Sequence, residues 1–152
     1  MAYFLNNVMH VKDRVYARSI SDACQALNLP MSEGTAGSII NGKNRMVWCP
    51  NTDCKTWVNI PFVENNNVVR IDESPCYNAT PRHTNHFETW ISQPNVERIT
   101  FLGDKSRKFY FVGIFKLDLP MSKELHKCVW KLKSTTYKLP KPSNRKFVLL
   151  ID

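Results

Sequence analysis

Residues 109–117, FYFVGIFKL, are apolar on both sides of an extended chain. Alternate residues of a strand point to opposite faces, and this separates one apolar set from another: Phe109, Phe111, Phe115 and Leu117 from Tyr110, Val112 and Ile114. A strand that is apolar on both faces is typical of the middle of a sheet. We therefore predict that this strand is central to the fold and that Gly113 marks a sharp bend or a close approach within it.

The segment before this strand, VERITFL (96–102), predicts the first half of a β-hairpin that continues to residue 118. The connecting residues, GDKSR (103–107), contain the Gly, Asp and Ser that favour a tight reversal. Lys105, Arg107 and Lys108 place three cations at or beside the tip. We interpret this tip as a candidate anion-binding loop.

Shorter patterns predict the other elements. Helices are expected over 19–29, which begins with a capping Ser and precedes Pro30, and over 119–127, which has a proline in its first turn. Apolar or alternating runs predict six further strands, at 8–11, 46–49, 55–62, 68–72, 128–133 and 146–151. The turn signal at 50–53 suggests that the second and third of these are neighbours. Residues 73–87 read as a long irregular loop, which is a second candidate element for the site.

Together these elements predict an α+β fold, with a curved mixed β-sheet or pseudo-barrel and two or three short flanking helices. The chain has 152 residues, of which 43% are hydrophobic. This length suits one core rather than two. We therefore expect a single domain spanning residues 1–152.

The charge of the chain favours a polyanionic partner. It carries 21 Lys and Arg against 13 Asp and Glu, a formal net charge of +8, and cations that neutralise phosphates gain from counterion release. No apolar run is long enough to span a membrane and no secretory leader pattern is present, so we expect no membrane partner. Five scattered cysteines suit a reducing, cytoplasmic location.

Aromatic and basic residues alternate along several predicted segments, as suits nucleic acid, because cations hold phosphates and rings stack on bases. The predicted base pocket comprises three rings and one carboxylate: Trp48, Trp57, Tyr77 and Asp72. The predicted phosphate contacts are six cations: Lys43, Arg45, Arg82, Lys105, Arg107 and Lys108. The opposing interpretation is that most of these rings are core residues and most of the cations are solvated.

Two pairs of residues have the spacing of zinc ligands. Cys49 and Cys54 form one pair, and His83 and His86 form the other. Two predicted strands lie between the pairs, which a compact zinc site would not contain. We therefore favour ordinary reduced thiols, and we expect no metal and no cofactor.

The hairpin RITFLGDKSRKFYFVGIFKLD, followed by a short helix and CVWKLK, resembles the PUA-like superfamily of β-barrel modules, which includes the SRA, EVE and ASCH groups. The segment FYFVGIFKLD also resembles strands of substrate-reading domains joined to bacterial restriction nucleases. The resemblance implies a pseudo-barrel whose concave face accepts a base, often a modified base flipped from a duplex. Gly113 and Phe115 match a strand that lines such a barrel.

These observations predict a nucleic-acid-binding module that reads a base, modified or not, in an aromatic pocket with a basic rim. Two alternatives stay open. One is a protein-binding inhibitor or adaptor, such as a phage-type anti-defence protein, whose basic face meets an acidic partner. The other is an ASCH-like ribonuclease that uses the region from Asp72 to His86, and this is the one reading in which the chain is an enzyme. The choice between DNA and RNA and the oligomeric state are left open.

Overall fold

The computed structural model describes residues 8–28, 45–53, 56–75, 86–140 and 148–151. Its strands are β1 (Val8–His10), β2 (Val15–Ala17), β3 (Arg45–Trp48), β4 (Trp57–Glu64), β5 (Asn67–Pro75), β6 (Glu97–Leu102), β7 (Phe109–Leu117), β8 (Cys128–Ser134), β9 (Thr136–Lys138) and β10 (Leu149–Ile151). Its helices are α1 (Ile20–Ala26), α3 (His86–Ile91) and α4 (Leu119–Leu125), with one 3₁₀ turn at Val11–Asp13. The α+β prediction is confirmed.

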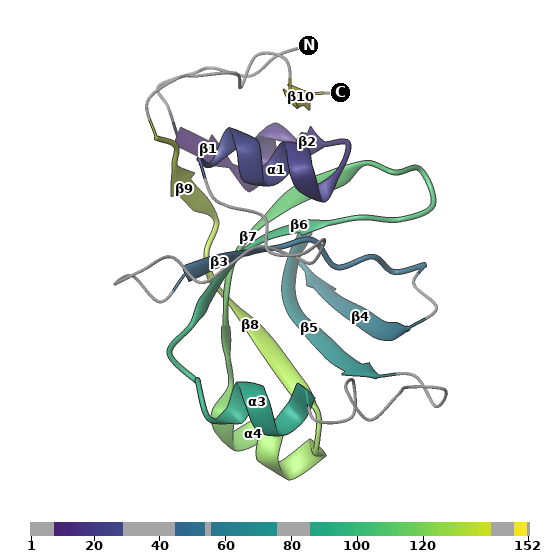
Figure 1. Ribbon diagram of the computed structural model, residues 1–152, viewed down its shortest axis with the longest axis vertical. Coiled ribbons are helices and arrows are strands. Elements are labelled where there is room, and N and C mark those ends of the chain that lie inside the picture. Colours follow the sequence, from purple (N-terminus) through teal and green to yellow (C-terminus); the bar gives the residue numbers. More distant parts are fainter. Residues whose placement is uncertain (1–7, 29–44, 54–55, 76–85, 141–147, 152) are drawn as a thin grey trace.

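One mixed, curved sheet holds eight of these strands, and β7 is its centre (Figure 1). Along one edge β7 pairs with β6, and along the other it pairs first with β2 and then with β8. The strand path runs β10-β2-β7-β8-β5-β4, and β3 is joined through β6. The sheet is therefore open and is not closed into a barrel. A separate pair, β1 with β9, lies next to α1.

Both helices predicted from the sequence are present, and each begins directly after a residue whose side chain caps it. The Ser19 hydroxyl accepts a hydrogen bond of 3.0 Å from the Asp22 amide at the start of α1. The Asp118 carboxylate accepts one of 3.0 Å from the Met121 amide at the start of α4, and a proline occupies the first turn. In Figure 1, α1 lies at one end of the molecule, and α3 and α4 lie together at the other.

The alternation along β7 is interrupted, which corrects one sequence prediction. Thr100 lies opposite Gly113 but Phe101 lies opposite Phe111, so Val112 is an extra residue in β7. Phe109 and Phe111 therefore face one core cluster, together with residues of α1, whereas Phe115 and Leu117 face the other, beside α3. We call these two sides of the sheet the α1 face and the α3 face.

The tryptophan-bearing strands are not neighbours, which corrects a second prediction. β3 runs parallel to β6, with Trp48 opposite Thr100, whereas β4 pairs antiparallel with β5. The turn at 50–53 instead holds the hairpin loop, because the Gly103 amide donates to the Pro50 carbonyl at 2.9 Å and the Thr52 amide donates to the Gly103 carbonyl at 3.0 Å. The structure also contains β2, β9 and α3, which the sequence pattern did not predict.

Candidate nucleic-acid interface

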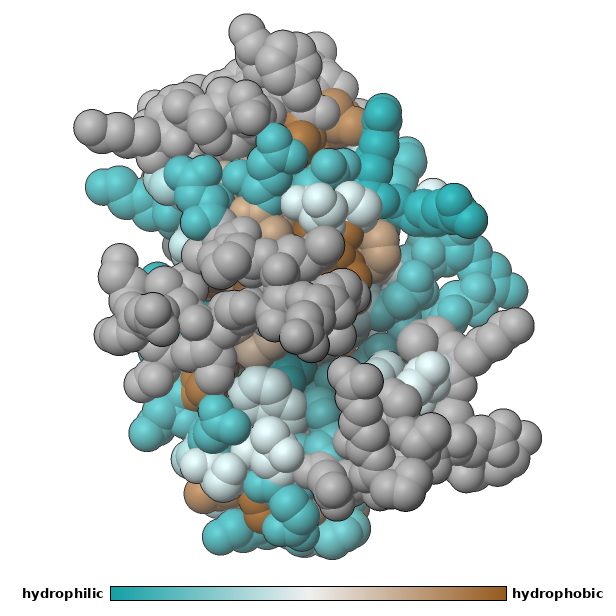
Figure 2. Space-filling view, in the orientation of Figure 1, coloured by the Kyte–Doolittle hydropathy of each residue, from teal (hydrophilic) through white to brown (hydrophobic). Residues whose placement is uncertain are grey.

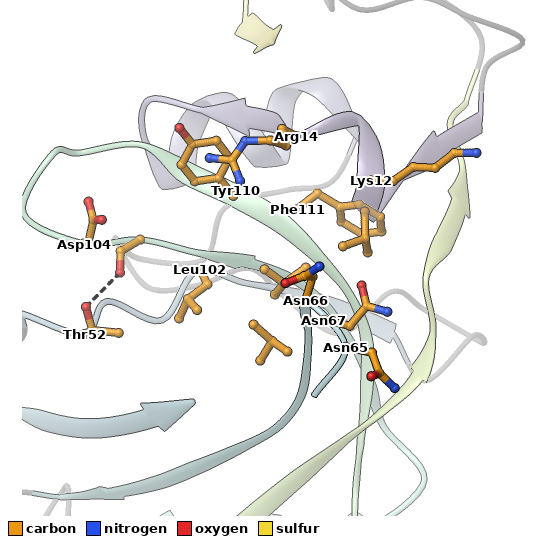
Figure 3. Close-up of a pocket in the computed structure, with 14 residues that line it drawn as sticks. Lys12, Arg14, Thr52, Asn65, Asn66, Asn67, Leu102, Asp104, Tyr110 and Phe111 are labelled. Atoms are coloured by element: carbon orange, nitrogen blue, oxygen red, sulfur yellow. Dashed lines mark hydrogen bonds between the residues drawn. The ribbon is translucent and has the colours of Figure 1, made fainter. Parts of the chain in front are cut away.

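A cavity of about 630 Å³ opens beside β7 (Figure 3), near the stretch between Tyr110, where the pairing of β7 with β2 stops, and Ile114, where its pairing with β8 starts. We call it the β7 cavity. Its apolar walls come from β5, β6, β7 and the 3₁₀ turn: Val11, Val68, Leu102, Tyr110, Phe111 and Val112. Its polar rim comes mainly from two segments, namely Lys12 and Arg14 before β2, and Asn65 to Asn67 at the turn between β4 and β5.

Cations and rings alternate at the edge of this cavity. The Arg14 guanidinium lies 4.7 Å from the centre of the Tyr110 ring, and the Tyr110 ring is 5.5 Å from that of Tyr16. The Lys108 ammonium in turn lies 5.0 Å from the Tyr16 ring. Such contacts hold a cation close to a flat apolar surface. A ligand with both a phosphate and a ring system therefore finds both partners within a short distance.

The hairpin loop lies on the rim of the same cavity, because Gly103 and Asp104 line it. Asp104 organises the loop by accepting hydrogen bonds from the hydroxyl (2.6 Å) and the amide (2.8 Å) of Ser106, and these lower the pKa of Asp104. A Cβ on Gly103 would lie 2.4 Å from the Phe109 ring, so any other residue there would require that ring to shift. The loop exposes Lys105 and Arg107 beside the cavity.

The turn opposite the loop is made of asparagines. Asn65 and Asn66 have φ of 50° and 65°, the left-handed conformation that Asn tolerates and that a type I′ hairpin turn requires at both central positions. Figure 3 shows the side chains of Asn65, Asn66 and Asn67 beside the cavity. Each amide offers both a donor and an acceptor, which is what hydrogen bonding to a base edge requires.

A second polar cluster is buried between β5, β6, β8 and α3. The Arg98 guanidinium lies 3.7 Å from the ring centre of Trp130 and donates to Glu73 at 3.1 Å. Glu73 also accepts from the Trp130 indole at 3.0 Å and contacts His86 at 2.7 Å. Burial alone would raise the pKa of Glu73, but Arg98, His86 and Trp130 hold it at about 2. Glu73 is therefore a carboxylate whose lone pairs are already used within the protein.

Three of the four sequence-predicted base-pocket residues, Trp48, Trp57 and Asp72, lie near this buried cluster and do not line the β7 cavity. Trp48 is 5% exposed, with its ring 5.7 Å from that of Trp130, and Trp57 is half-buried, with its ring 4.4 Å from that of His86. Asp72 is 2% exposed and binds Arg70 at 2.6 Å and Lys127 at 2.8 Å.

A base could stack on Trp48 only if this packing opened. Tyr77 lies outside the described residues. The stacking and base-edge roles of Trp48, Trp57, Tyr77 and Asp72 therefore stay predictions.

The predicted phosphate contacts fall into separate places. Lys105, Arg107 and Lys108 lie together on the hairpin loop, whose Gly103 and Asp104 line the β7 cavity, but they do not line the cavity themselves. Arg45 lies on β3 and is bound to Glu97 at 2.9 Å. Lys43 and Arg82 lie outside the part of the chain that the structure describes. All six roles stay predictions.

Of the four candidate zinc ligands, Cys54 and His83 lie outside the described residues. Cys49 is buried in the core cluster beside α1, whereas His86 binds Glu73 on the α3 face. Glu73, His86 and Cys128 have possible ligand atoms within 4.8 Å of one another. A metal ion there would face the Arg98 cation that already pairs with Glu73, and burial, together with the charge of Glu73, raises the pKa of the Cys128 thiol to about 12.

Several residues of the candidate site were missed by the sequence reading. Lys12 and Arg14 lie in a stretch of mixed polarity with no regular period, and their position depends on the pairing of β2 with β7. Asn65 to Asn67 were predicted as a turn, but nothing in the local sequence indicated that this turn lies beside β7.

No helix in the described residues is long and apolar enough to cross a membrane.

Among solved structures, the 5-hydroxymethylcytosine-specific restriction enzyme AbaSI is similar to this chain, with a TM-score of 0.60 and 17% identity. The match covers 90% of this chain but 44% of that chain, so this chain spans less than half of the enzyme's length. At this identity the similarity concerns the fold alone. No family model and no curated protein matches the sequence.

Proposed function

We propose that this protein is a nucleic-acid-binding module that accepts a base in the β7 cavity and holds the adjoining backbone with the cations around it. The observation that carries the proposal is the combination, in one place, of a cavity of about 630 Å³, two aromatic rings and a basic rim. Sites for small ligands generally measure about 300–1,000 Å³ and are mostly apolar, with a few polar groups that fix orientation.

Each part of the cavity has a distinct task in this proposal. Tyr110 supplies flat surface for a base, Phe111 closes the apolar wall behind it, and the amides of Asn65 to Asn67 hydrogen-bond the base edge. Lys12 and Arg14, with Lys105 and Arg107 of the hairpin loop, contact phosphates. Base recognition and backbone binding are therefore carried by different residues and can be altered separately.

The fold similarity supports DNA with a modified base as the ligand, since the similar enzyme is specific for 5-hydroxymethylcytosine. A base must leave the duplex stack to enter a cavity of this kind, which costs a few kcal/mol. Charge alone cannot recover that cost selectively. Contacts to the ring faces and to the base edge are the source of selectivity.

The test is binding of labelled DNA duplexes that differ only in one central base: cytosine, 5-methylcytosine or 5-hydroxymethylcytosine. We expect the wild-type protein to prefer a modified duplex in fluorescence anisotropy. The Asn66→Gly variant keeps the left-handed turn but removes the amide, so we expect it to lose about 10-fold or more of that preference, in line with ~1–3 kcal/mol for a good base-edge contact.

The matched control is Asn28→Gly. Asn28 also has a positive φ, 54°, but it lies at the end of α1 and does not line the β7 cavity. This variant should bind as the wild type does. Equal affinity of the wild-type protein for all three duplexes, unchanged in Asn66→Gly, would refute base reading in this cavity.

A further inference from the structure

A line of cations crosses the α1 face of the sheet, beyond the part that α1 covers. Its members lie directly opposite one another on neighbouring strands: Arg70 on β5, Lys131 on β8, Lys116 on β7, then Glu97 on β6 and Arg45 on β3. Directly opposite residues project from the same face, and neighbouring strands are ~4.8 Å apart. This line, which we call the cationic row, therefore runs roughly 19 Å across five strands.

The order of charges in the row is unfavourable for the protein by itself. Arg70, Lys131 and Lys116 are three cations in successive opposite positions. Like charges directly opposite one another destabilise a sheet. Asp72 and Asp118 reach Arg70 and Lys131 from the side, at 2.6 and 3.2 Å, and offset part of this repulsion. The remaining excess of positive charge is a feature that an anionic ligand would stabilise.

The neighbours of the row keep it positive. Lys133 binds Glu97, and Lys127 binds Asp72 at 2.8 Å. The row and the side chains that touch it thus hold six cations (Arg45, Arg70, Lys116, Lys127, Lys131 and Lys133) and three carboxylates (Asp72, Glu97 and Asp118). The side chains of Lys131 and Lys133 are 45% and 54% exposed, so a ligand in solution can reach them.

The row ends in a hollow of about 250 Å³ between β3, β8 and β9. Arg45, Lys133 and Lys138 bring three cations to this hollow, against one carboxylate, Glu97. Hydroxyl groups of Ser134, Thr136 and Tyr137 also line it. Cations and hydroxyl groups are the side chains that bind phosphate oxygens.

We propose that the cationic row and its hollow bind the phosphate backbone of a nucleic acid, at a site separate from the β7 cavity. The two sites share no lining residue, and the β7 cavity is lined on the opposite, α3 face by Leu102 and Tyr110 as well as on the α1 face by Phe111. A protein partner would need apolar anchors at the centre of its interface. The centre of the row consists of Lys131 and Lys116, and this favours a phosphate backbone over an acidic protein. The inference depends on the proposed function only for the class of ligand.

The test uses the double variant Lys116→Gln, Lys131→Gln and an unmodified 30-base-pair DNA duplex, with the affinity measured over a series of salt concentrations. Each phosphate contact contributes ~0.9 to the slope of log K against log salt concentration, so we expect the slope to fall by about 1.8 and the affinity at ~0.1 M salt to fall at least tenfold. Because the variant removes repulsion between opposite cations, its Tm should be equal to or above that of the wild type. A merely structural row would not combine weaker binding with retained stability.

The control removes the same two charges elsewhere, by Arg18→Gln with Lys123→Gln, both exposed and outside the row. An unchanged salt slope in the row variant would overturn the inference. So would displacement of the wild-type protein's duplex by polyglutamate but not by a second duplex, because this would indicate a protein partner. The Asn66→Gly variant should keep the wild-type slope on the unmodified duplex, so failure of base reading and failure of the row are distinguishable.

Discussion

At the scale of single residues, Arg98 is the side chain around which the aromatic rings on the α3 face pack. Its guanidinium is within 4.5 Å of the ring centres of Trp48, Trp90 and Trp130 and pairs with the buried Glu73. A planar, weakly hydrated guanidinium suits such a site better than an ammonium would. Removing one partner of a buried ion pair is costly because the other charge is left uncompensated.

We predict that Glu73 makes the stability of this protein acid-sensitive. The pKa of Glu73 is about 2 in the folded protein, below its ordinary value of 4.5, so the folded state favours the ionised form. The corresponding stability is fully present above pH ~4.5 and is lost as the pH falls towards 2. Urea unfolding at a series of pH values should show this loss in the wild-type protein.

The Glu73→Gln variant should lack that part of the pH dependence and should be less stable at neutral pH by about 3–5 kcal/mol. Glu124→Gln, at an exposed position on α4, is the control and should follow the wild type. A wild-type free energy of unfolding that is constant from pH 4.5 to 2 would contradict the prediction, and this holds even if Glu73→Gln does not fold.

At the scale of elements, the bulge in β7 divides the strand into two halves with different partners. The half before Gly113 pairs with β2 and borders the β7 cavity, whereas the half after it pairs with β8 and carries Lys116. Gly113 has a φ of 125°, and a Cβ there would lie 2.4 Å from Leu132 and 2.7 Å from the Ser134 carbonyl. Both the conformation and the space therefore require glycine.

We predict that Gly113→Ala destabilises the protein by about 3 kcal/mol, since strain from the positive φ adds to the clash with β8. Chemical denaturation monitored by tryptophan fluorescence measures this change. A variant within roughly 0.5 kcal/mol of the wild type, the usual range for harmless surface changes, would show that the backbone at the bulge can relax.

At the scale of the whole molecule, strand β4 is an edge of the sheet with an apolar outer side. Val58, Ile60 and Phe62 are 39%, 46% and 40% exposed, and Val63 is 61% exposed. Exposed apolar residues on an edge strand promote association with other chains. This stripe is the observation that favours protein binding as a second function, and self-association is its simplest form.

We predict that the wild-type protein self-associates at high concentration and that Ile60→Lys keeps it monomeric, because a charge on the stripe opposes burial. Sedimentation velocity over a range of concentrations measures the change. Preference for a modified base should be unaffected, since Ile60 does not line the β7 cavity. A wild-type protein that stays monomeric at the highest attainable concentration would argue against this association.

The elements that the sequence predicted well are those with local signals. The hairpin of β6 and β7 has a long apolar pattern, and α1 and α4 have capping residues. The three-residue strands β2 and β9 are too short to show a period, and the parallel pairing of β3 with β6 joins residues about 50 positions apart. The hairpin-loop cations could be predicted because they belong to the same local pattern as the hairpin. The positions of Lys12, Arg14 and the cationic row could not, because they depend on pairings between strands that are distant in the sequence.

The cationic row lies on the α1 face, whereas Leu102 and Tyr110 line the β7 cavity from the α3 face, and this limits the shape of a complex that uses the row and that side of the cavity together. A DNA duplex is stiff, with a persistence length of about 150 base pairs, so a straight segment cannot contact both faces of one small sheet. A single duplex engaged at both sites would have to curve sharply around an edge of the protein. Otherwise two separate duplexes would be brought together by one copy of the chain, which would then act as a bridge between distant stretches of DNA.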